Sequence, residues 1–348
     1  MLLFRSVFMT LGLAIAVQAG PKEDSGWVSL FNGTDFNDFY AYFQDNGVVD
    51  MAKQDAFFID EGLLHVRKAH DGGFSKIEGH LITRKEYSWY RVRVDYRYST
   101  NAEAQNAGLV IHIENKAALV DGIKTLRPRS IEINMRRMEA SPWTLWSATG
   151  LGPYITTTVK AGTNNYLAKD QGGVEWTNDP WGERIIRTTL PNSEKAMGEW
   201  NHGEALVAGD SMLVCTLNGQ LRTVGWHLQL RGSPNDATPS KRVPCDRGGI
   251  GLQSEGQEIW YRNFEIMELE PHTLKPLNAK PTGLARNNGY GDGVDIGNPA
   301  LRALRSDGNG HLTFSNREKR YDAAGRKTGH PPETGHPWRR DVPTDTHP

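Results

Sequence analysis

Alternating hydrophobic and polar residues define the clearest strand-like segment of the chain, residues 79–100. Within it, Tyr90, Val92, Val94, Tyr96 and Tyr98 fall on one face, and Arg91, Arg93, Asp95 and Arg97 fall on the other. A strict period of two is typical of a β-strand with one buried and one solvated face. We therefore predict one long strand whose tyrosines and valines face a core.

Two later segments repeat this alternation and indicate a shared polar face. The segment 107–114 would point Leu109, Ile111 and Ile113 inward and Val110, His112 and Glu114 outward. The segment 129–138 would bury Ile131, Ile133 and Met135 and expose Glu132, Asn134 and Arg136. Because consecutive strands are neighbours roughly two-thirds of the time, we expect His112, Glu132 and Asn134 to share one surface.

The stretch 248–269 combines two strand patterns with a polar turn over 254–257. Ile250 and Leu252 alternate with polar or small residues, and the alternation resumes after the turn with Ile259 and Tyr261. Its phase changes at Arg262-Asn263, which predicts a bulge. Such a bulge would redirect Arg262 across a face of the sheet, where Arg262 and Gln253 are candidates for one wall of a cleft.

The remaining strand signals are shorter: an opening strand over 26–31, a hairpin over 57–66, a run over 154–159, and a hairpin whose Asn218-Gly219 pair fits a type I′ turn. We predict that 140–195 is otherwise irregular and that 225–247 is a loop. The first of these contains Trp143, Trp146, Trp176 and Trp181, which would either stack on sugar rings or fill the edge of the core.

Composition supports an all-β domain followed by a tail. The 37 glycines and 18 prolines suit many short strands and tight turns, whereas the segment 271–348 has few apolar residues and is predicted to be poorly ordered. The net charge is -1, from 40 basic and 41 acidic residues. No basic face stands out, so we predict no nucleic-acid partner.

The first nineteen residues predict export. Arg5 precedes an apolar run over 7–17, and Val17-Gln18-Ala19 has the small residues of a cleavage site. The run is too short to span a bilayer, so we expect a cleaved signal peptide over 1–19, a secreted or periplasmic protein, and no transmembrane span after cleavage.

The two cysteines, Cys215 and Cys245, fit either a disulfide of an exported protein or two free thiols. No histidine lies at metal-ligand spacing from either cysteine, so zinc is not predicted. The sequence indicates no cofactor, although a divalent metal at Glu132, Asn134 and His112 stays open.

Four motifs resemble the 3-keto-disaccharide hydrolase domain family: GWVSLFNGTD, GHLITRKEYSWYRVRVDYR, GEWN followed by LNG, and GGIGLQSEGQEIWYRNFEIMEL. They occur in order and cover residues 25–270. The resemblance implies a concanavalin A-like jelly-roll β-sandwich, which agrees with the strand patterns. It also implies cleavage of the glycosidic bond of sugars oxidised to a ketone at carbon 3, by a hydrolase route or a lyase and hydratase route.

The resemblance and the strand phases together select candidate site residues. Glu132 and His112 are the candidate catalytic groups, because such a reaction needs a base and an acid. Saccharide-binding candidates are Arg97, Arg262, Asn134, Gln253 and Trp146. Residues 106–112 read NAGLVIH where the family often has NSG followed by an aromatic residue and Arg, a departure at the expected cleft.

Two other functions stay open at this point. One is a non-catalytic carbohydrate-binding module that uses the tryptophans of 140–195 as stacking platforms. The other is a structural or adhesion domain, since the fold itself permits many functions.

Overall fold

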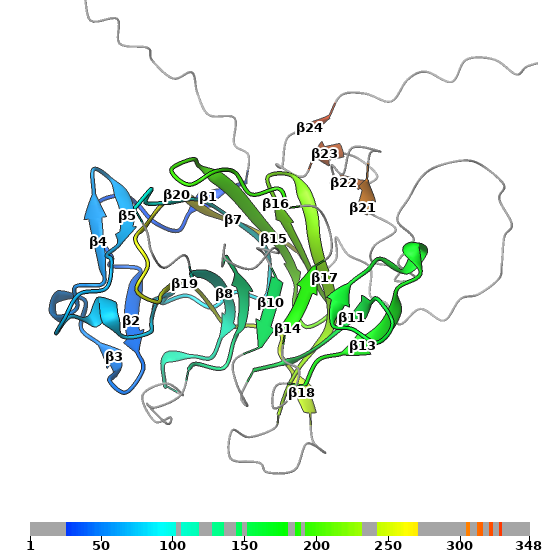
Figure 1. Cartoon of the computed structure of the whole chain (residues 1–348), viewed down its shortest axis with the longest axis horizontal. Coiled ribbons are helices and arrows are strands. Elements are labelled where there is room, and N and C mark those ends of the chain that lie inside the picture. The colour runs from blue at the N-terminus through cyan, green and yellow to red at the C-terminus, as the bar shows by residue number, and fades with distance from the viewer. Residues whose placement is uncertain are drawn as a thin grey trace, which may run out of the picture.

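The computed structural model describes residues 26–101, 106–117, 127–135, 144–147, 152–179, 185–188, 192–231 and 242–270, together with four short strands between 304 and 328. The predicted all-β jelly-roll sandwich is confirmed, because two antiparallel sheets enclose one main hydrophobic core (Figure 1). In the described part of the chain, no helix has the length and apolar character needed to cross a membrane.

Sheet A runs in the order β4–β5–β20–β7–β15–β16–β17–β11–β13, with β1 beside β20, β18 beside β17 and β12 beside β11. Its strands are β1 (Val28–Ser29), β4 (Phe57–Asp60), β5 (Leu63–Val66), β7 (Trp89–Tyr98), β11 (Tyr154–Val159), β12 (Asn165–Tyr166), β13 (Val174–Thr177), β15 (Asn201–Ala208), β16 (Met212–Leu217), β17 (Gln220–Arg231), β18 (Arg242–Pro244) and β20 (Ile259–Glu268). In Figure 1, the green to yellow strands β15, β16 and β17 run side by side.

Sheet B runs in the order β3–β2–β6–β19–β8–β9–β10–β14. Its strands are β2 (Phe39–Phe43), β3 (Gly47–Val49), β6 (Gly79–Thr83), β8 (Gly108–Ile113), β9 (Ile131–Asn134), β10 (Thr144–Ser147), β14 (Ile185–Thr188) and β19 (Gly249–Ser254). Strand β14 also pairs in parallel with β12 of sheet A, so it joins the two sheets. The short 3-10 helices are η1 (Met51–Lys53), η2 (Phe74–Lys76) and η3 (Lys169–Gln171).

The core lies between the sheets and contains the face predicted from the alternation in 90–98. All five residues Tyr90, Val92, Val94, Tyr96 and Tyr98 are at most 2% exposed. They share one cluster with the inward residues of β8, β9 and β19. The Tyr98 hydroxyl donates to the Met135 carbonyl at 3.0 Å, which links the two sheets across the core.

The predicted single strand over 79–100 is wrong in its extent. The segment forms β6 in sheet B and β7 in sheet A, so the chain changes sheets between them. Thr83 Oγ1 donates to the Lys85 carbonyl at 2.8 Å, and the Arg84 amide donates to the Asp38 carbonyl. These hydrogen bonds form at the polar residues where the chain leaves sheet B. A period of two in the sequence does not reveal this change of sheet.

Two predicted irregular segments contain strands. The predicted run over 154–159 is confirmed as β11, but residues 140–195 also contain β10, β12, β13 and β14, and β17 and β18 occupy parts of 225–247. Strands β10, β12, β13, β14 and β18 have two to four residues each, which is too few for apolar alternation to mark them. Trp176 is half-buried and packs against the core, as the edge-filling alternative predicts, whereas Trp143 and Trp181 lie outside the described residues.

Other predictions have mixed outcomes. Both turn residues Asn218 and Gly219 have positive φ, at 50° and 79°, which confirms the type I′ hairpin. The hairpin over 57–66 is confirmed as β4 and β5, and the opening strand is shorter than predicted. Cys215 and Cys245 are buried free thiols, so the disulfide alternative is wrong.

The tail contains four short strands in an antiparallel sheet of their own: β21 (Leu304–Ser306), β22 (Leu312–Ser315), β23 (Arg320–Asp322) and β24 (Lys327–Thr328). The predicted signal peptide lies outside the described residues.

Candidate functional site

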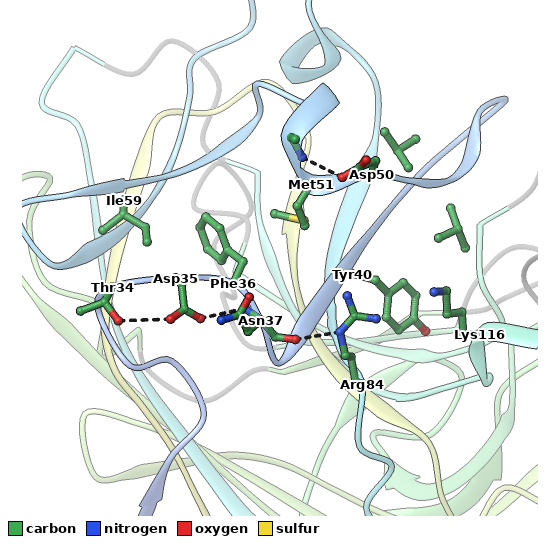
Figure 2. Close-up of a pocket in the computed structure, with 13 residues that line it drawn as sticks. Thr34, Asp35, Phe36, Asn37, Tyr40, Asp50, Met51, Ile59, Arg84 and Lys116 are labelled. Carbon is green, nitrogen blue, oxygen red and sulfur yellow. Dashed lines mark hydrogen bonds between the residues drawn. The ribbon is translucent and has the colours of Figure 1, made fainter.

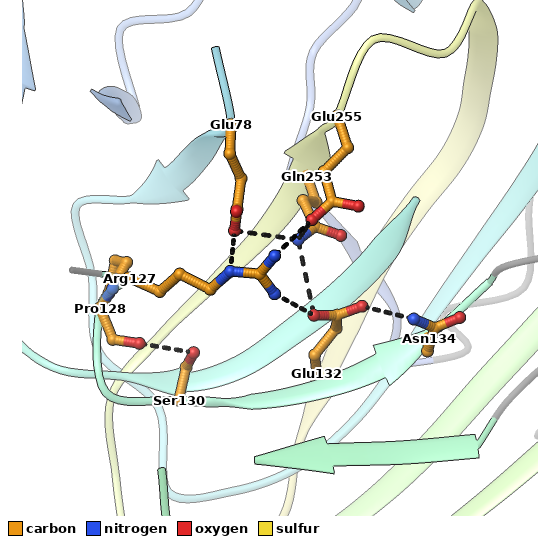
Figure 3. Close-up of polar contacts among 8 residues, drawn as sticks. All are labelled: Glu78, Arg127, Pro128, Ser130, Glu132, Asn134, Gln253 and Glu255. Atoms are coloured by element: carbon orange, nitrogen blue, oxygen red, sulfur yellow. Dashed lines mark hydrogen bonds and ion pairs between the residues drawn. The ribbon is translucent and has the colours of Figure 1, made fainter. Parts of the chain in front are cut away.

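Six polar side chains gather on the face of sheet B that points away from the core (Figure 3). This group, which we call the carboxylate cluster, consists of Glu78, Arg127, Glu132, Asn134, Gln253 and Glu255. Figure 3 shows the guanidinium of Arg127 between the three carboxylates.

The strands of sheet B position Glu132, Asn134 and Gln253, the central residues of the cluster. Strand β9 buries Ile131 and Ile133 in the core, so Glu132 and Asn134 project from the opposite face. A Cβ on Gly108 would lie 2.7 Å from Glu132 Cγ and 3.0 Å from Gln253 Oε1. The glycine therefore makes room for the Glu132 side chain to approach Gln253.

Arg127 connects the three carboxylates. Its Nε lies 2.5 Å from Glu78 Oε1, its Nη2 lies 2.9 Å from Glu255 Oε1, and its Nη1 lies 3.6 Å from Glu132 Oε2. One guanidinium thus faces three acids, so full ionisation would leave the four groups with a net negative charge. Such a surplus favours proton uptake by at least one carboxylate.

Two amides complete the cluster. Gln253 Nε2 donates to Glu255 Oε1 at 2.9 Å and lies 3.5 Å from both Glu78 Oε1 and Glu132 Oε2. Asn134 Nδ2 donates to Glu132 Oε1 at 2.8 Å, which orients that carboxyl group. The buried Gln253 Oε1 has no hydrogen-bond partner among the described residues, so an acceptor remains beside Glu132.

Burial raises the pKa of two of the carboxyl groups. Burial raises the pKa of Glu132 to about 8, and the negative charge of Glu255 adds to the effect. Burial also raises the pKa of Glu78 to about 7, although the positive charge of Arg127 opposes this. Near neutral pH both groups can therefore exchange a proton, which is what general acid and base catalysis requires.

Three predicted site residues meet in this cluster: Glu132, Asn134 and Gln253. A fourth, Trp146 of β10, lies opposite Glu132 in the strand register, and its side chain lies outside the described residues.

His112 is not on the face of Glu132, so the predicted shared surface is wrong for this residue. Its φ of 50° interrupts the alternation, and the register between β8 and β19 shifts at the same place. The ring packs on the core side, 6.1 Å from the Tyr90 ring, and its Nδ1 lies 2.8 Å from the Cys245 carbonyl oxygen. Burial lowers the pKa of His112 to about 4.

The same irregularity changes the position of Ile113. Instead of facing the main core as predicted, Ile113 packs in a small apolar cluster with Tyr40, Tyr42, Ile82 and Val110. With His112 displaced, it cannot form a metal site with Glu132 and Asn134. Within the described residues, no group of three or more His, Cys, Asp or Glu side chains could hold a metal ion.

Arg97 and Arg262 also lie away from Glu132, which corrects the predicted single cleft. The bulge at Arg262-Asn263 is confirmed, because Asn263 has a φ of 48° and the register with β7 shifts there. Arg262 Nε lies 3.2 Å from Asp95 Oδ2, and Arg97 contacts Trp200 and Trp260. Both arginines are therefore on the outer face of sheet A, with the core between them and Glu132.

A pocket of about 720 Å³ lies beside β2 (Figure 2). Its walls include Asp35, Phe36, Tyr40, Arg84 and Lys116. Tyr40 begins a register row across sheet B that continues through Ile82, Gly251 and Val110 to Glu132. The pocket is therefore four strands away from Glu132, and no member of the carboxylate cluster lines it.

Sequence patterns did not reveal Glu78, Arg127 and Glu255. Each lies just outside a strand: before β6, before β9 and after β19. A signal was available only for Glu255, which lies in the polar turn 254–257, two residues after the candidate Gln253.

Known structures similar to the chain include a protein of Parabacteroides distasonis that carries the name glycosyl hydrolase. It is 18% identical, covers 72% of this chain and 98% of its own, and has a TM-score of 0.41. The carbohydrate-binding module CBM66 of Bacillus subtilis is 10% identical, with 70% and 96% coverage and a TM-score of 0.33. A β-glucanase of Bacillus licheniformis is 9% identical, with 69% and 96% coverage and a TM-score of 0.33.

No curated protein matches the chain. The model of the 3-keto-alpha-glucoside-1,2-lyase-like domain matches residues 26–267, which include both sheets except the last residue of β20. The chain therefore belongs to this carbohydrate-active family.

Proposed function

We propose that the chain cleaves the glycosidic bond of 3-keto-glycosides, with Glu132 as the group that removes the proton from carbon 2. The observation that carries the proposal is the buried Glu132 carboxyl group, whose pKa is raised to about 8, inside a cluster of three carboxylates. The family description supports the choice of substrate.

The first step is proton abstraction. A ketone at carbon 3 acidifies the proton on carbon 2, because the resulting negative charge delocalises onto the ketone oxygen as an enolate. An ionised Glu132 takes this proton, and its raised pKa makes it a stronger base than an ordinary carboxylate. The electrons of the C2–H bond then form a C1=C2 double bond as the bond from carbon 1 to the glycosidic oxygen breaks.

The departing oxygen needs a proton, and Glu78 is the second group suited to proton transfer. Its pKa of about 7 makes the protonated and ionised forms nearly equally populated at neutral pH. Arg127 contacts both carboxylates, and its positive charge stabilises negative charge that develops on the substrate. Water then adds across the double bond, with oxygen on carbon 1 and a proton on carbon 2, and yields the free 3-keto sugar.

The two amides have positioning roles. Asn134 holds one oxygen of Glu132, so that the other faces Arg127 and Gln253. The unpartnered Oε1 of Gln253 would accept a hydrogen bond from a sugar hydroxyl, which would fix the sugar beside the base.

The test is sugar release from a panel of 3-keto-glucosides with α and β linkages. We expect release by the wild-type protein and a loss of at least about 10²-fold in Glu132→Gln. Glu204→Gln is the matched control, because Glu204 is also buried but pairs with Arg91 on sheet A. Unchanged release in Glu132→Gln would overturn the proposal, and saccharide binding with no product would favour the carbohydrate-binding module.

Export remains a separate proposal that rests on residues 1–19. We expect the mature protein to begin at Gly20 when it is expressed with its natural start. Amino-terminal sequencing of the protein recovered from the culture medium or periplasm would show this, and a chain that keeps Met1 would contradict it.

A further inference from the structure

A row of stacked planar side chains crosses the outer face of sheet A. Trp260 lies opposite His65 of β5 and opposite Arg97 of β7 in the strand register. The His65 and Trp260 ring centres are 4.1 Å apart, and Arg97 Cζ lies 5.3 Å from the Trp260 centre and 4.8 Å from that of Trp200. Arg262 Cζ lies 4.1 Å from the Trp200 centre. We call these five residues the Trp–Arg ladder.

The arginines of β7 differ in how their charges are balanced. Arg91 and Arg93 form ion pairs with Glu204 and Glu265, and both lie over the Trp27 ring. Among the residues that the structure describes, no carboxylate pairs with Arg97, whose recorded contacts are with the two indole rings. Within the described part of the chain, Arg97 therefore has no acid that balances its charge, whereas Asp60 and Glu258 contact Trp260 and His65 at the other end of the ladder.

Asp95 organises the neighbouring groups. Its carboxylate accepts from His202 Nδ1 at 2.7 Å, from Asn263 Nδ2 at 2.7 Å and from Arg262 Nε at 3.2 Å. His202 therefore carries its proton on Nδ1, which leaves Nε2 available, and Arg262 keeps its terminal NH₂ groups for another acceptor. The side chains of His202 and Arg262 are 38% and 43% exposed, so a ligand can reach them.

We propose that Arg97, Arg262 and His202 form a second saccharide site, which binds the carboxylate of a uronic acid residue without cleaving it. The guanidinium groups of Arg97 and Arg262 both lie over the Trp200 ring. Among the described residues, Asp95 is the only acid that pairs with either of them. A guanidinium presents paired N–H donors that match a carboxylate, and stacking on indole holds its plane fixed. The site is independent of Glu132, which lies on the other sheet.

The competing interpretation is that the ladder only stabilises sheet A through cross-strand stacking. The two interpretations differ in what a loss of charge does. A binding site loses affinity for the acidic sugar, whereas a purely structural ladder loses thermal stability and leaves affinity unaffected.

Calorimetric titration of the full chain with trigalacturonate, with a neutral trisaccharide as the comparison, tests the proposal. We expect trigalacturonate to bind and the neutral trisaccharide not to bind. Added salt should weaken the binding of trigalacturonate. Arg97→Gln and Arg262→Gln should each reduce affinity by at least about tenfold, which corresponds to about 1.4 kcal/mol. Arg247→Gln is the matched control, because Arg247 is 62% exposed and pairs with Glu86 outside the ladder.

Arg262→Gln keeps the test decisive if Arg97→Gln does not fold, since Arg262 is the more exposed of the two. Glu132→Gln should bind trigalacturonate as the wild type does, so failure of this site and failure of the proposed catalytic function are distinguishable. Equal binding of neutral and acidic sugars, no binding at all, or unchanged affinity in both arginine variants would overturn the proposal. Complete displacement by inorganic sulfate at equal concentration would overturn the saccharide part.

Discussion

The arginines on the outer faces of the two sheets have different acidic neighbours. On sheet B, three carboxylates surround Arg127, whereas on sheet A, Arg97 and Arg262 are accompanied by Asp95. A carboxylate surplus can be relieved by binding protons, as the raised pKa of Glu132 shows. A guanidinium keeps its proton in this pH range, so on our proposal the charge of Arg97 is neutralised by an anion. The two proposals thus assign proton transfer to the outer face of sheet B and anion binding to the outer face of sheet A.

Arg127→Met should have the largest effect on the sheet B cluster, because it removes the guanidinium that contacts all three carboxylates. We expect the free energy of unfolding to fall by about 3–5 kcal/mol at pH 8, where the acids are most ionised. The loss should be smaller at pH 5, because protonated carboxyls need no cation. Denaturant unfolding at both pH values measures this, and equal losses would contradict the charge argument.

The pH dependence of stability should have opposite signs for the two faces. The pKa of Glu132 is raised from 4.5 to about 8 in the folded protein. Its stabilising contribution is therefore complete below the unfolded pKa and is lost as the pH rises toward 8. Relative to Glu132→Gln, we expect the unfolding free energy of the wild type to fall by about 2–4 kcal/mol between pH 5 and pH 8.

Asp95 provides the opposite case. The hydrogen bonds from His202, Asn263 and Arg262 outweigh burial, so they lower its pKa below 3.8. Its contribution is present above the unfolded pKa and is lost as the pH falls through the folded value. As the pH falls below 4, the unfolding free energy of Asp95→Asn should therefore decrease less than that of the wild type. An unchanged acid transition would show that Asp95 is not the responsible group.

Gly108→Ala should cost about 1–3 kcal/mol of stability, because its Cβ would lie 2.7 Å from Glu132 Cγ. The same substitution in a Glu132→Ala background should cost clearly less, since the clashing atom is absent. A double-mutant cycle of unfolding free energies measures the difference. Additive effects would mean that Gly108 is needed for another reason.

Trp200→Leu should have the smallest effect on stability, about 1–2 kcal/mol, because it removes two cation–π contacts at a partly exposed site. Thermal unfolding of the variant measures this. A loss above about 4 kcal/mol would be in the range of core substitutions and would favour a structural role for the Trp–Arg ladder.

The sequence predicted features that depend on one strand at a time. Alternation identified the buried tyrosines of β7, the outward Glu132 and Asn134 of β9, and the bulge that redirects Arg262. These follow from local geometry, because a period of two or its interruption is visible in a few consecutive residues.

Features that depend on the backbone conformation of one residue or on contacts between distant segments could not be predicted. The positive φ of His112 reverses the side-chain order in β8, and a histidine within a strand pattern is not enough to predict it. Arg127, Glu78 and Glu255 meet only because β6, β9 and β19 belong to one sheet. The opposite placement of Arg97 and Glu132 likewise follows from the assignment of β7 and β9 to different sheets.

The most direct test of the central claim is to follow hydrogen exchange at carbon 2 during the reaction. A 3-keto-glucoside is incubated with the protein in deuterated water, and the released sugar is examined by nuclear magnetic resonance. Elimination followed by hydration predicts one deuterium at carbon 2 of the product, formed by the wild type and not by Glu132→Gln or by the buffer alone. Release of sugar that retains its original hydrogen at carbon 2 would contradict proton abstraction by Glu132.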